Sequence, residues 1–317
     1  MKPPFVAVLV LAACSFASDR PTLRQTIALP AHVNVRVTAI SPAGKLIAAA
    51  CSDGKILLWD VASGTLKNTL DLSGEGLTAL QFDRSGELLA AGGKEGSLRV
   101  WDSSGSLKHE YKLPAEVDAI AFSPDRSSIA AAPLERPVEV LSLADGKTLA
   151  SLPATFGGSA SIAFSPDGRW LATADVDTEV RIIDAHSFAV HARGTDFLLE
   201  PFALTFSPDS NRLMVGGADG VITVLDADTA KTVRAFPKQP LVIFAICASP
   251  DGRSVAGAYF DANQITAPGV TLVWDASSGS SRTVASETGF NGGNYLNDNT
   301  LLLTSGSEKE LKVWADR

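Results

Sequence analysis

The stretch "IAFSPDGRWLATADVDTEVRIID", Ile162–Asp184, decides the fold of this chain. Alternating apolar residues predict strands at "SIAF", "RWLATA" and "EVRIID", and a fourth follows at "SFAVHARG". The quartet Ser165-Pro166-Asp167-Gly168 has the proline and glycine placement of a tight turn, and Asp177-Thr178 forms the next one. The stretch therefore predicts a unit of four short antiparallel strands.

Six further copies of this unit fill the rest of the chain. The positions equivalent to Ser165 follow one another at steps of 40 or 42 residues, with a last step of 48, and they are Ser41, Asp83, Ser123, Ser207, Ser249 and Asn297. Four strands repeated seven times at a period near 42 are the signature of a β-propeller. We therefore expect an all-β, seven-bladed propeller that forms one domain over residues 18–317.

The two ends of the repeat region complement each other. The last copy stops at "LKVWADR" without an outer strand, whereas "TLRQTIAL", residues 22–29, is an outer strand that precedes the first copy. Pairing the two would complete the seventh blade and remove the open sheet edges. We expect the N-terminal strand to close the ring.

The repeats resemble the WD-repeat family over residues 22–317. Its terminal dipeptide is present at Trp59-Asp60, Trp101-Asp102 and Trp274-Asp275, while Trp314 is followed by Ala315. The remaining copies keep an apolar residue in the tryptophan position, at Leu141, Ile183 and Leu225. The Gly-His dipeptide common in the family is missing. The resemblance implies a rigid scaffold that binds another protein and has no enzymatic activity.

Residues 1–17 have the composition of a secretory signal. One Lys precedes an apolar run, Phe5 to Ala13, which is too short to span a bilayer as a stable helix. Two cleavage sites compete: before Cys14, where Leu11-Ala12-Ala13-Cys14 resembles a bacterial lipobox, or after Ala17. We expect an exported protein, lipidated at Cys14 and periplasmic or anchored to the outer membrane, with free secretion or a cytoplasmic start as alternatives.

Composition narrows the choice of partner. The chain has 27 Lys and Arg against 35 Asp and Glu, a net charge of −8, and no basic stripe of the kind that a phosphate backbone requires. Nucleic acid is therefore not expected. Cys51 and Cys247 fall in blades 1 and 6, which are not neighbours, so no disulfide is expected either. We expect a monomer that binds another protein.

The sequence contains no constellation of catalytic or metal-binding residues. The innermost strands carry only two charges, Arg36 and Asp118, and no histidine has a second ligand at metal-binding spacing. Asp175, Asp177 and Glu179 alternate like the start of a calcium loop but lack its glycine and distal glutamate, which favours a hairpin turn. We predict no cofactor, no metal and no enzyme. The alternative is a small-molecule-binding or lactonase-like hydrolytic propeller.

The sixth copy is longer than the others. Its extra residues lie in a hairpin, Tyr259–Pro268, which the resemblance places on the top face together with the crossover into blade 7. Aromatic and amide side chains of these two segments are our candidates for partner contact. They are Tyr259, Phe260, Asn263, Gln264, Phe290, Asn291, Asn294 and Tyr295. The other interpretation is that Phe290 or Tyr295 fills a gap between blades.

Overall fold

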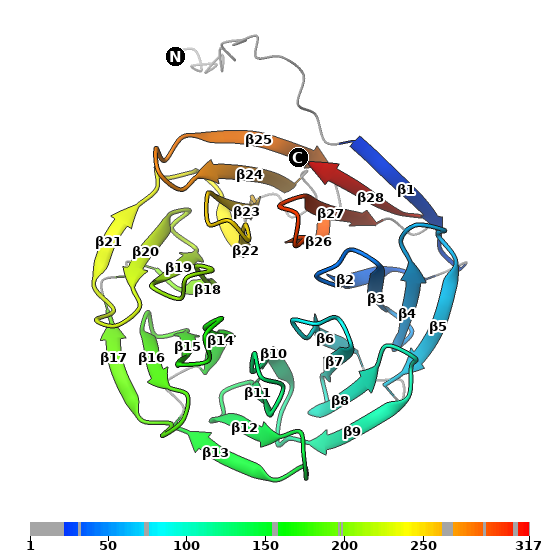
Figure 1. Cartoon of the computed structure of the whole chain (residues 1–317), viewed down its shortest axis with the longest axis horizontal. Helices are drawn as coiled ribbons and strands as arrows, with labels where there is room; N and C mark the ends of the chain where they lie inside the picture. Colours follow the sequence, from blue (N-terminus) through cyan, green and yellow to red (C-terminus); the bar gives the residue numbers. More distant parts are fainter. Residues whose placement is uncertain are drawn as a thin grey trace, which may run out of the picture.

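A computed structural model describes residues 22–30, 33–72, 76–153, 158–195, 197, 199–261, 269–287, 290–306 and 310–316. In these residues, seven four-stranded antiparallel sheets are arranged around a common axis (Figure 1). Strands succeed one another from the axis outward in each sheet. The predicted seven-bladed propeller is confirmed.

The strands of the first four blades are short and similar in length. They are β2 (Val35–Ile40), β3 (Leu46–Cys51), β4 (Lys55–Asp60) and β5 (Leu66–Asp71) in blade 1; β6 (Leu77–Phe82), β7 (Leu88–Gly93), β8 (Ser97–Asp102) and β9 (Leu107–Lys112) in blade 2; β10 (Val117–Phe122), β11 (Ser128–Pro133), β12 (Val138–Ser142) and β13 (Thr148–Leu152) in blade 3; and β14 (Ser159–Phe164), β15 (Trp170–Asp175), β16 (Val180–Asp184) and β17 (Val190–Gly194) in blade 4.

The last three blades follow the same order, and the first strand of the chain belongs to the seventh. They contain β18 (Pro201–Phe206), β19 (Arg212–Gly217), β20 (Ile222–Asp226) and β21 (Thr232–Ala235) in blade 5; β22 (Val242–Ala248), β23 (Ser254–Phe260), β24 (Gly269–Asp275) and β25 (Ser281–Glu287) in blade 6; and β26 (Phe290–Tyr295), β27 (Leu301–Gly306), β28 (Glu310–Asp316) and β1 (Thr22–Ala28) in blade 7.

The N-terminal strand closes the ring, as the sequence predicts. Strand β1 pairs antiparallel with β28, from Thr22 opposite Ala315 to Ala28 opposite Glu310. Ile27 of β1 is buried against Leu311 and Val313, so the strand contributes to the core as well as to the hydrogen-bond ladder. Blade 7 is thereby built from both ends of the chain.

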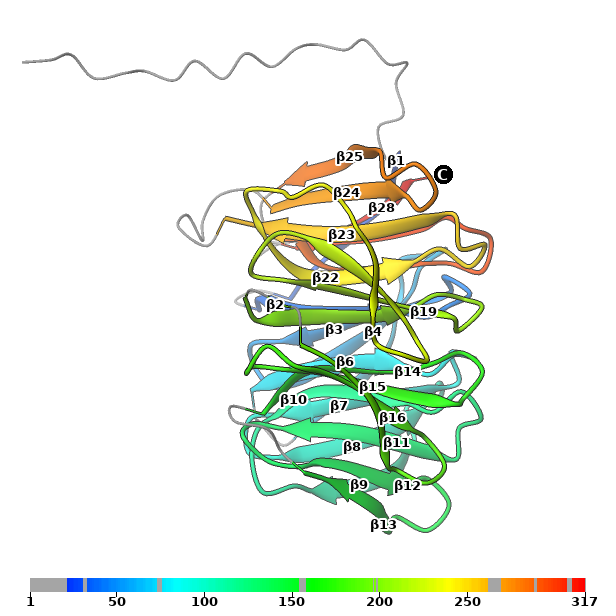
Figure 2. The same ribbon diagram turned by 90° about the vertical axis from the view of Figure 1, so that its left-hand side faces the viewer.

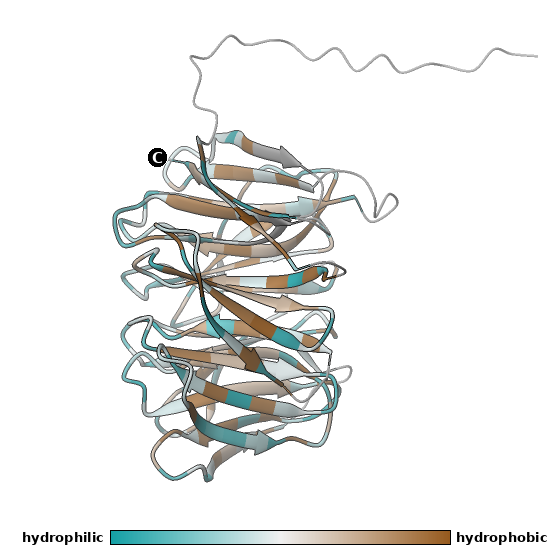
Figure 3. Cartoon of the chain, turned by 90° about the vertical axis from the view of Figure 1, so that its right-hand side faces the viewer, coloured by the Kyte–Doolittle hydropathy of each residue, from teal (hydrophilic) through white to brown (hydrophobic). Residues whose placement is uncertain are grey.

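The core lies between blades. Each blade presents one apolar face to the next, and a typical cluster joins Ile56 and Leu58 of blade 1 to Leu89 and Trp101 of blade 2. Viewed from the side, the loops that join the strands project to two opposite faces of the ring (Figure 2). Apolar residues follow the strands, while hydrophilic residues gather in these loops (Figure 3). The two loop faces and the innermost strands are therefore the surfaces that can present a site.

The turn after each innermost strand is built by repeated side-chain bonds. In blade 4 the Ser165 hydroxyl donates to Asp167 Oδ1 at 2.6 Å and accepts from the Trp170 amide at 2.9 Å. The amide of Asp167 donates in turn to Ser210 Oγ of blade 5, at 3.1 Å. We call the face that carries these turns the bottom face, and the opposite one the top face. Hydrogen bonds between turns of neighbouring blades hold the bottom face in place.

Candidate functional site

Every innermost strand carries a bulge near its start, on the top face. The pairing of each innermost strand with its neighbour skips one residue, for example between Ile243 and Ala245 in β22. A bulged residue is left out of the hydrogen-bond ladder, and the bulge re-aims its side chain. The seven skipped residues, one per blade, are Arg36, Thr78, Asp118, Ala160, Phe202, Phe244 and Asn291. We call them the bulge ring.

The bulge ring is apolar and aromatic over blades 5 and 6. Phe202 is half-buried, and Phe244, with 37% of its surface exposed, is the one aromatic residue among the exposed large apolar side chains of the described residues. The Phe244 ring meets the Phe260 ring edge to face, with centroids 5.7 Å apart at an interplanar angle of 63°. An aromatic pair, one ring exposed and the other half-buried, thus stands on the top face of blade 6.

The two charges of the innermost strands both belong to the bulge ring. Arg36 is exposed on blade 1, and Asp118 is half-buried on blade 3, so blade 2 separates them. Burial raises the pKa of Asp118 to about 6, and the nearby carboxylate of Glu116 adds to the effect. Thr78 is the bulge-ring residue of blade 2, between these two charges, and its hydroxyl donates a hydrogen bond to the Val117 carbonyl at 2.8 Å. The described residues of the ring place no second carboxylate or histidine beside Asp118.

The structure corrects part of the predicted contact surface. Tyr259 was expected to be exposed on the hairpin, but that expectation is wrong because the residue lies within β23 and its side chain is 0% exposed. Its hydroxyl accepts a hydrogen bond from Trp274 Nε1 at 2.9 Å, and burial raises its pKa to about 12. Tyr259 is a core residue of blade 6.

Tyr295 is also buried, at 8% exposure, and packs with Ala256 and Val273 of blade 6 and Leu303 of blade 7. This agrees with the alternative interpretation, in which it fills a gap between blades. Phe260 and Asn294 are half-buried and remain candidates for contact.

The structure describes only some of the other predicted contact residues. Asn263 and Gln264 lie outside the described residues. Phe290 and Asn291 begin β26, where the backbone places Asn291 in the bulge ring. Their role in binding stays a prediction. Sequence reasoning missed Phe202 and Phe244, although "PFALTF" and "VIFAICA" each carry a phenylalanine near the strand start, where blades 1 and 3 carry Arg36 and Asp118.

The three acids that resemble a calcium loop do lie together, with one carboxylate oxygen from each within 4.8 Å of the others. Asp175 is fully buried, however, and its carboxylate is bound by Arg181 Nε at 2.7 Å and by the Ser159 hydroxyl. A buried charge held by a charged partner is a structural pair. Asp177 and Glu179 belong to the hairpin between β15 and β16, as the sequence predicts.

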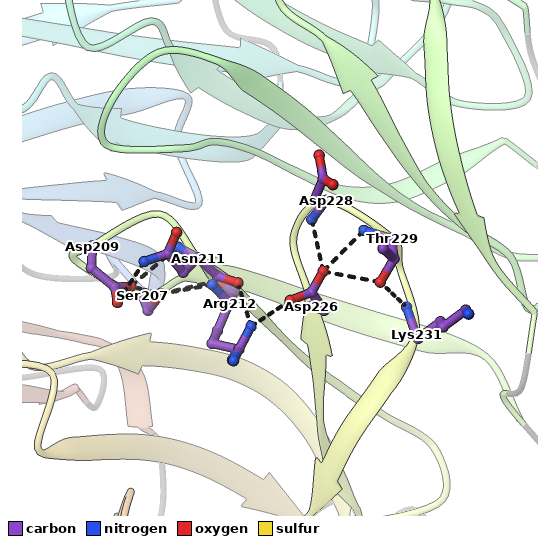
Figure 4. Close-up of polar contacts among 8 residues, drawn as sticks. All are labelled: Ser207, Asp209, Asn211, Arg212, Asp226, Asp228, Thr229 and Lys231. Carbon is purple, nitrogen blue, oxygen red and sulfur yellow. Dashed lines mark hydrogen bonds and ion pairs between the residues drawn. The ribbon is translucent and has the colours of Figure 1, made fainter.

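The aspartates of the bottom face are also used internally. Asp226 Oδ1 accepts bonds from the amides of Asp228 and Thr229 and from the Thr229 hydroxyl, and Oδ2 meets Arg212 Nη1 at 2.5 Å (Figure 4). The hydroxyl of Thr229 is the largest of the influences that lower the pKa of Asp226. Ser207 and Asp209 form the neighbouring turn in the same way. These acids organise turns, which leaves the bulge ring as the best candidate site.

Two further sequence predictions can be checked. Cys51 and Cys247 are both free thiols, so no disulfide joins blades 1 and 6. In the part of the chain that the structure describes, no helix has the length and apolarity needed to cross a membrane.

Comparison with known proteins agrees with the geometry. The family model "WD domain, G-beta repeat" matches residues 22–60, 64–102, 146–184 and 198–226. The chain is 29% identical over 126 residues to the periodic tryptophan protein 2 homolog of Schizosaccharomyces pombe, a match covering 39% of this chain and 15% of the relative. It is 28% identical over 94 residues to the retinoblastoma-binding protein 5 homolog of Drosophila melanogaster, covering 29% and 19%. The chain thus spans less than a fifth of these curated relatives.

Solved structures share the whole fold. A chain from the crystal structure of the mitotic checkpoint complex superposes with a TM-score of 0.80 at 17% identity, covering 95% of this chain and 98% of that one. The Cps50 (Swd1) β-propeller domain of Myceliophteria thermophila gives a TM-score of 0.79 at 17% identity, covering 94% and 100%. At this identity the likeness establishes the fold alone.

The molecule is a closed seven-bladed β-propeller with a chemically uneven ring of bulge residues on one face. Four stretches of the chain match the WD-repeat family model, whose members are typically protein-interaction scaffolds, and these matches agree with the resemblance described in the sequence. None of the family matches reaches residues 1–21, so cleavage and lipidation at Cys14 stay predictions.

Proposed function

We propose that this protein is a scaffold that holds another protein against the top face, on the aromatic side of the bulge ring. The observation that carries the proposal is the exposed Phe244 packed edge-on against Phe260. Aromatic side chains at rigid positions supply much of the binding energy of protein interfaces, because they bury a large area at little entropic cost. Both residues lie on strands of blade 6, which positions them better than a loop would.

The surroundings support this position. Phe202 takes the same bulge position in the neighbouring blade 5, and the extra residues of the blade 6 hairpin follow Asp261 in the sequence. One relative of this chain is named as a retinoblastoma-binding protein homolog. A chain of similar fold was solved as part of the mitotic checkpoint complex. Association with a protein is the role that these observations favour.

Capture of a partner tests the proposal. Residues 18–317 would be immobilised and exposed to an extract of the producing cells, beside a Phe244→Ser variant and a variant that lacks residues 261–267. Val233→Ser, which removes a 53% exposed side chain from the outer strand of blade 5, is the matched control. We expect the same protein to be retained by the parent and by the control and lost from Phe244→Ser at unchanged melting temperature. Retention of the same protein by Phe244→Ser would exclude the aromatic side of the bulge ring as the binding surface.

We further propose that the protein acts in the cell envelope of a bacterium, tethered by a lipid on Cys14. The support is the sequence of residues 1–17 alone. Metabolic labelling with a radioactive fatty acid and membrane fractionation test it. Label on the parent and none on Cys14→Ser, which should move to the soluble fraction, is the expected result; an unlabelled parent protein with residues 1–17 intact would contradict it.

A further inference from the structure

A small pocket opens between blades 6 and 7, beside the aromatic pair. Its exposed lining residues are Phe244 on β22 and Gly293 on β26, so the mouth lies at the innermost strands. From there it runs outward between the two sheets, past Ala258 and Leu303, to Thr271 on β24. We call it the inter-blade slot. Its volume is about 40 Å³.

Two glycines line the slot at positions where a side chain does not fit. A Cβ atom on Gly293 would lie 2.7 Å from Leu303 Cδ2, and one on Gly257, which also lines the slot, would lie 2.8 Å from the ring of Tyr259. Neither position can therefore extend a side chain into the space without displacing a buried neighbour. The slot follows from the backbone of this particular blade pair.

The end of the slot farthest from its mouth carries an unsatisfied polar group. Thr271 is 2% exposed, and its hydroxyl is the one buried side-chain oxygen or nitrogen among the described residues that has no hydrogen-bond partner. Leaving a buried hydroxyl unpaired costs stability, and native proteins rarely keep one without a use. A group that enters the slot would meet this hydroxyl, which can donate or accept.

The chemistry of the walls defines what can enter. The lining side chains are uncharged: burial raises the pKa of Cys247 to about 12, so its thiol is protonated at neutral pH. A charged group would lose its hydration without compensation. The volume exceeds what a single water needs, roughly 10–15 Å³, and is far below the roughly 300–1,000 Å³ of a cofactor site. The slot is therefore large enough for water or for the end of a small aliphatic group, and too small for a cofactor.

We propose that the inter-blade slot is a binding site for a short, uncharged aliphatic group that carries one hydrogen-bonding atom, which Thr271 recognises. The group can belong to a residue of a bound peptide or to a free small molecule. The peptide source rests on the proposed function, whereas the slot itself does not. In either case the exposed Phe244 forms the side of the mouth.

Titration followed by methyl NMR tests the slot on residues 18–317. The probes are N-acetyl-leucine-methylamide for a peptide source, isobutyramide for a free molecule, and N-acetyl-lysine-methylamide as the charged control. We expect saturable shifts of the Thr271, Ala258 and Leu303 methyl signals with one or both uncharged probes and none with the lysine probe. The uncharged probe that binds more tightly shows whether the group belongs to a peptide or to a free small molecule. Equal shifts with all three, or no saturable shift with either uncharged probe, would overturn the proposal.

Two variants tie the binding to this pocket. Thr271→Val removes the unpaired hydroxyl at constant shape, so the melting temperature should rise while affinity for the bound probe falls roughly 2- to 10-fold. Ala258→Leu should fill the slot and abolish binding; if it does not fold, Thr271→Val decides alone. Unchanged affinity in Thr271→Val would refute recognition by the hydroxyl. Capture of a partner by Thr271→Val at full strength would leave the proposed function standing even then.

Discussion

At the scale of single residues, the turns show where backbone conformation overrides residue preference. The hairpins between the second and third strands of blades 1, 2 and 5 place Gly54, Gly96 and Gly220 at positive φ. In blade 4 the same position is taken by Thr178, with φ of 69°. A β-branched residue rarely adopts this region, because its Cβ approaches the following carbonyl. Thr178 is therefore strained.

Replacing Thr178 with glycine should relieve this strain. The left-handed conformation costs an L-residue about 1–2 kcal/mol, and the extra freedom of glycine in the unfolded chain offsets about 0.4–1 kcal/mol of the gain. We expect the melting temperature, measured by calorimetry, to rise by roughly 1–3 °C. Asp177→Gly, one residue earlier at ordinary φ, is the control and should lower it. A lower melting temperature for Thr178→Gly would show that no strain is present.

The raised pKa of Asp118 predicts a pH dependence of stability. The folded-state pKa is about 6, above the value of about 3.9 in an unfolded chain. The folded state therefore binds more protons between these values, and the contribution of Asp118 to stability is full below about pH 4 and is lost as the pH rises through 6. Asp118→Asn should be more stable than the parent near neutral pH and equal to it near pH 4. A difference in melting temperature between Asp118→Asn and the parent that does not change with pH across this range would contradict the assignment.

At the scale of elements, an Asp ends the third strand of blades 1, 2, 4, 5 and 6 and caps the turn that follows. Hydrogen bonds from within the turn are the largest cause of the lowered pKa of Asp60, Asp184, Asp226 and Asp275. An acid whose folded-state pKa is depressed stabilises the fold above its unfolded pKa and loses that contribution as the pH falls through the folded value.

The capped turns should therefore make the propeller sensitive to acid. We expect the melting temperature to hold above about pH 4 and to fall steeply below it, as the capping aspartates take up protons. Asp226→Asn should flatten the acid limb slightly and lower the melting temperature at neutral pH, because the amide keeps an acceptor oxygen for the turn but loses the negative charge and turns a donor toward Arg212. Circular dichroism melts at intervals of pH would measure both. A flat profile down to pH 2 would refute the role of the caps.

The elements themselves could be predicted because their signals are local. The alternation in "RWLATA" and the Pro-Asp-Gly turn beside it need no tertiary information, and seven copies reinforce one another. The bulges could not be predicted, because they arise from the register of two paired strands. Tyr259 was misplaced for a related reason: β23 continues through Phe260, which puts Tyr259 opposite Ile243 inside the sheet. The unsatisfied Thr271 likewise depends on which neighbours the fold supplies.

At the scale of the whole molecule, one strand determines whether the ring is closed. Strand β1 supplies the outer edge of blade 7 and buries Ile27, which is 3% exposed. Removing it would open the β28 edge and expose part of the core between blades 7 and 1.

Deletion of this strand should destabilise the protein severely. Loss of one buried isoleucine costs about 2–5 kcal/mol, and loss of the hydrogen bonds between β1 and β28 adds to this cost. The total free energy of unfolding of a domain is only about 5–15 kcal/mol. We expect a chain of residues 29–317 to unfold or aggregate under conditions in which residues 18–317 melt cooperatively, as size-exclusion chromatography and urea titration would show. Equal urea midpoints would mean that blade 7 is stable with three strands.

The pairing of the first strand with the last also sets the order of events during biosynthesis. Thr22 is synthesised 293 positions before its partner Ala315. Blades 1 to 6 can pair internally as they appear, but β1 has to wait for β28. A nascent chain therefore carries an unpaired strand until β28 is synthesised, and a stop codon that removes β28 leaves both β1 and β27 without this partner.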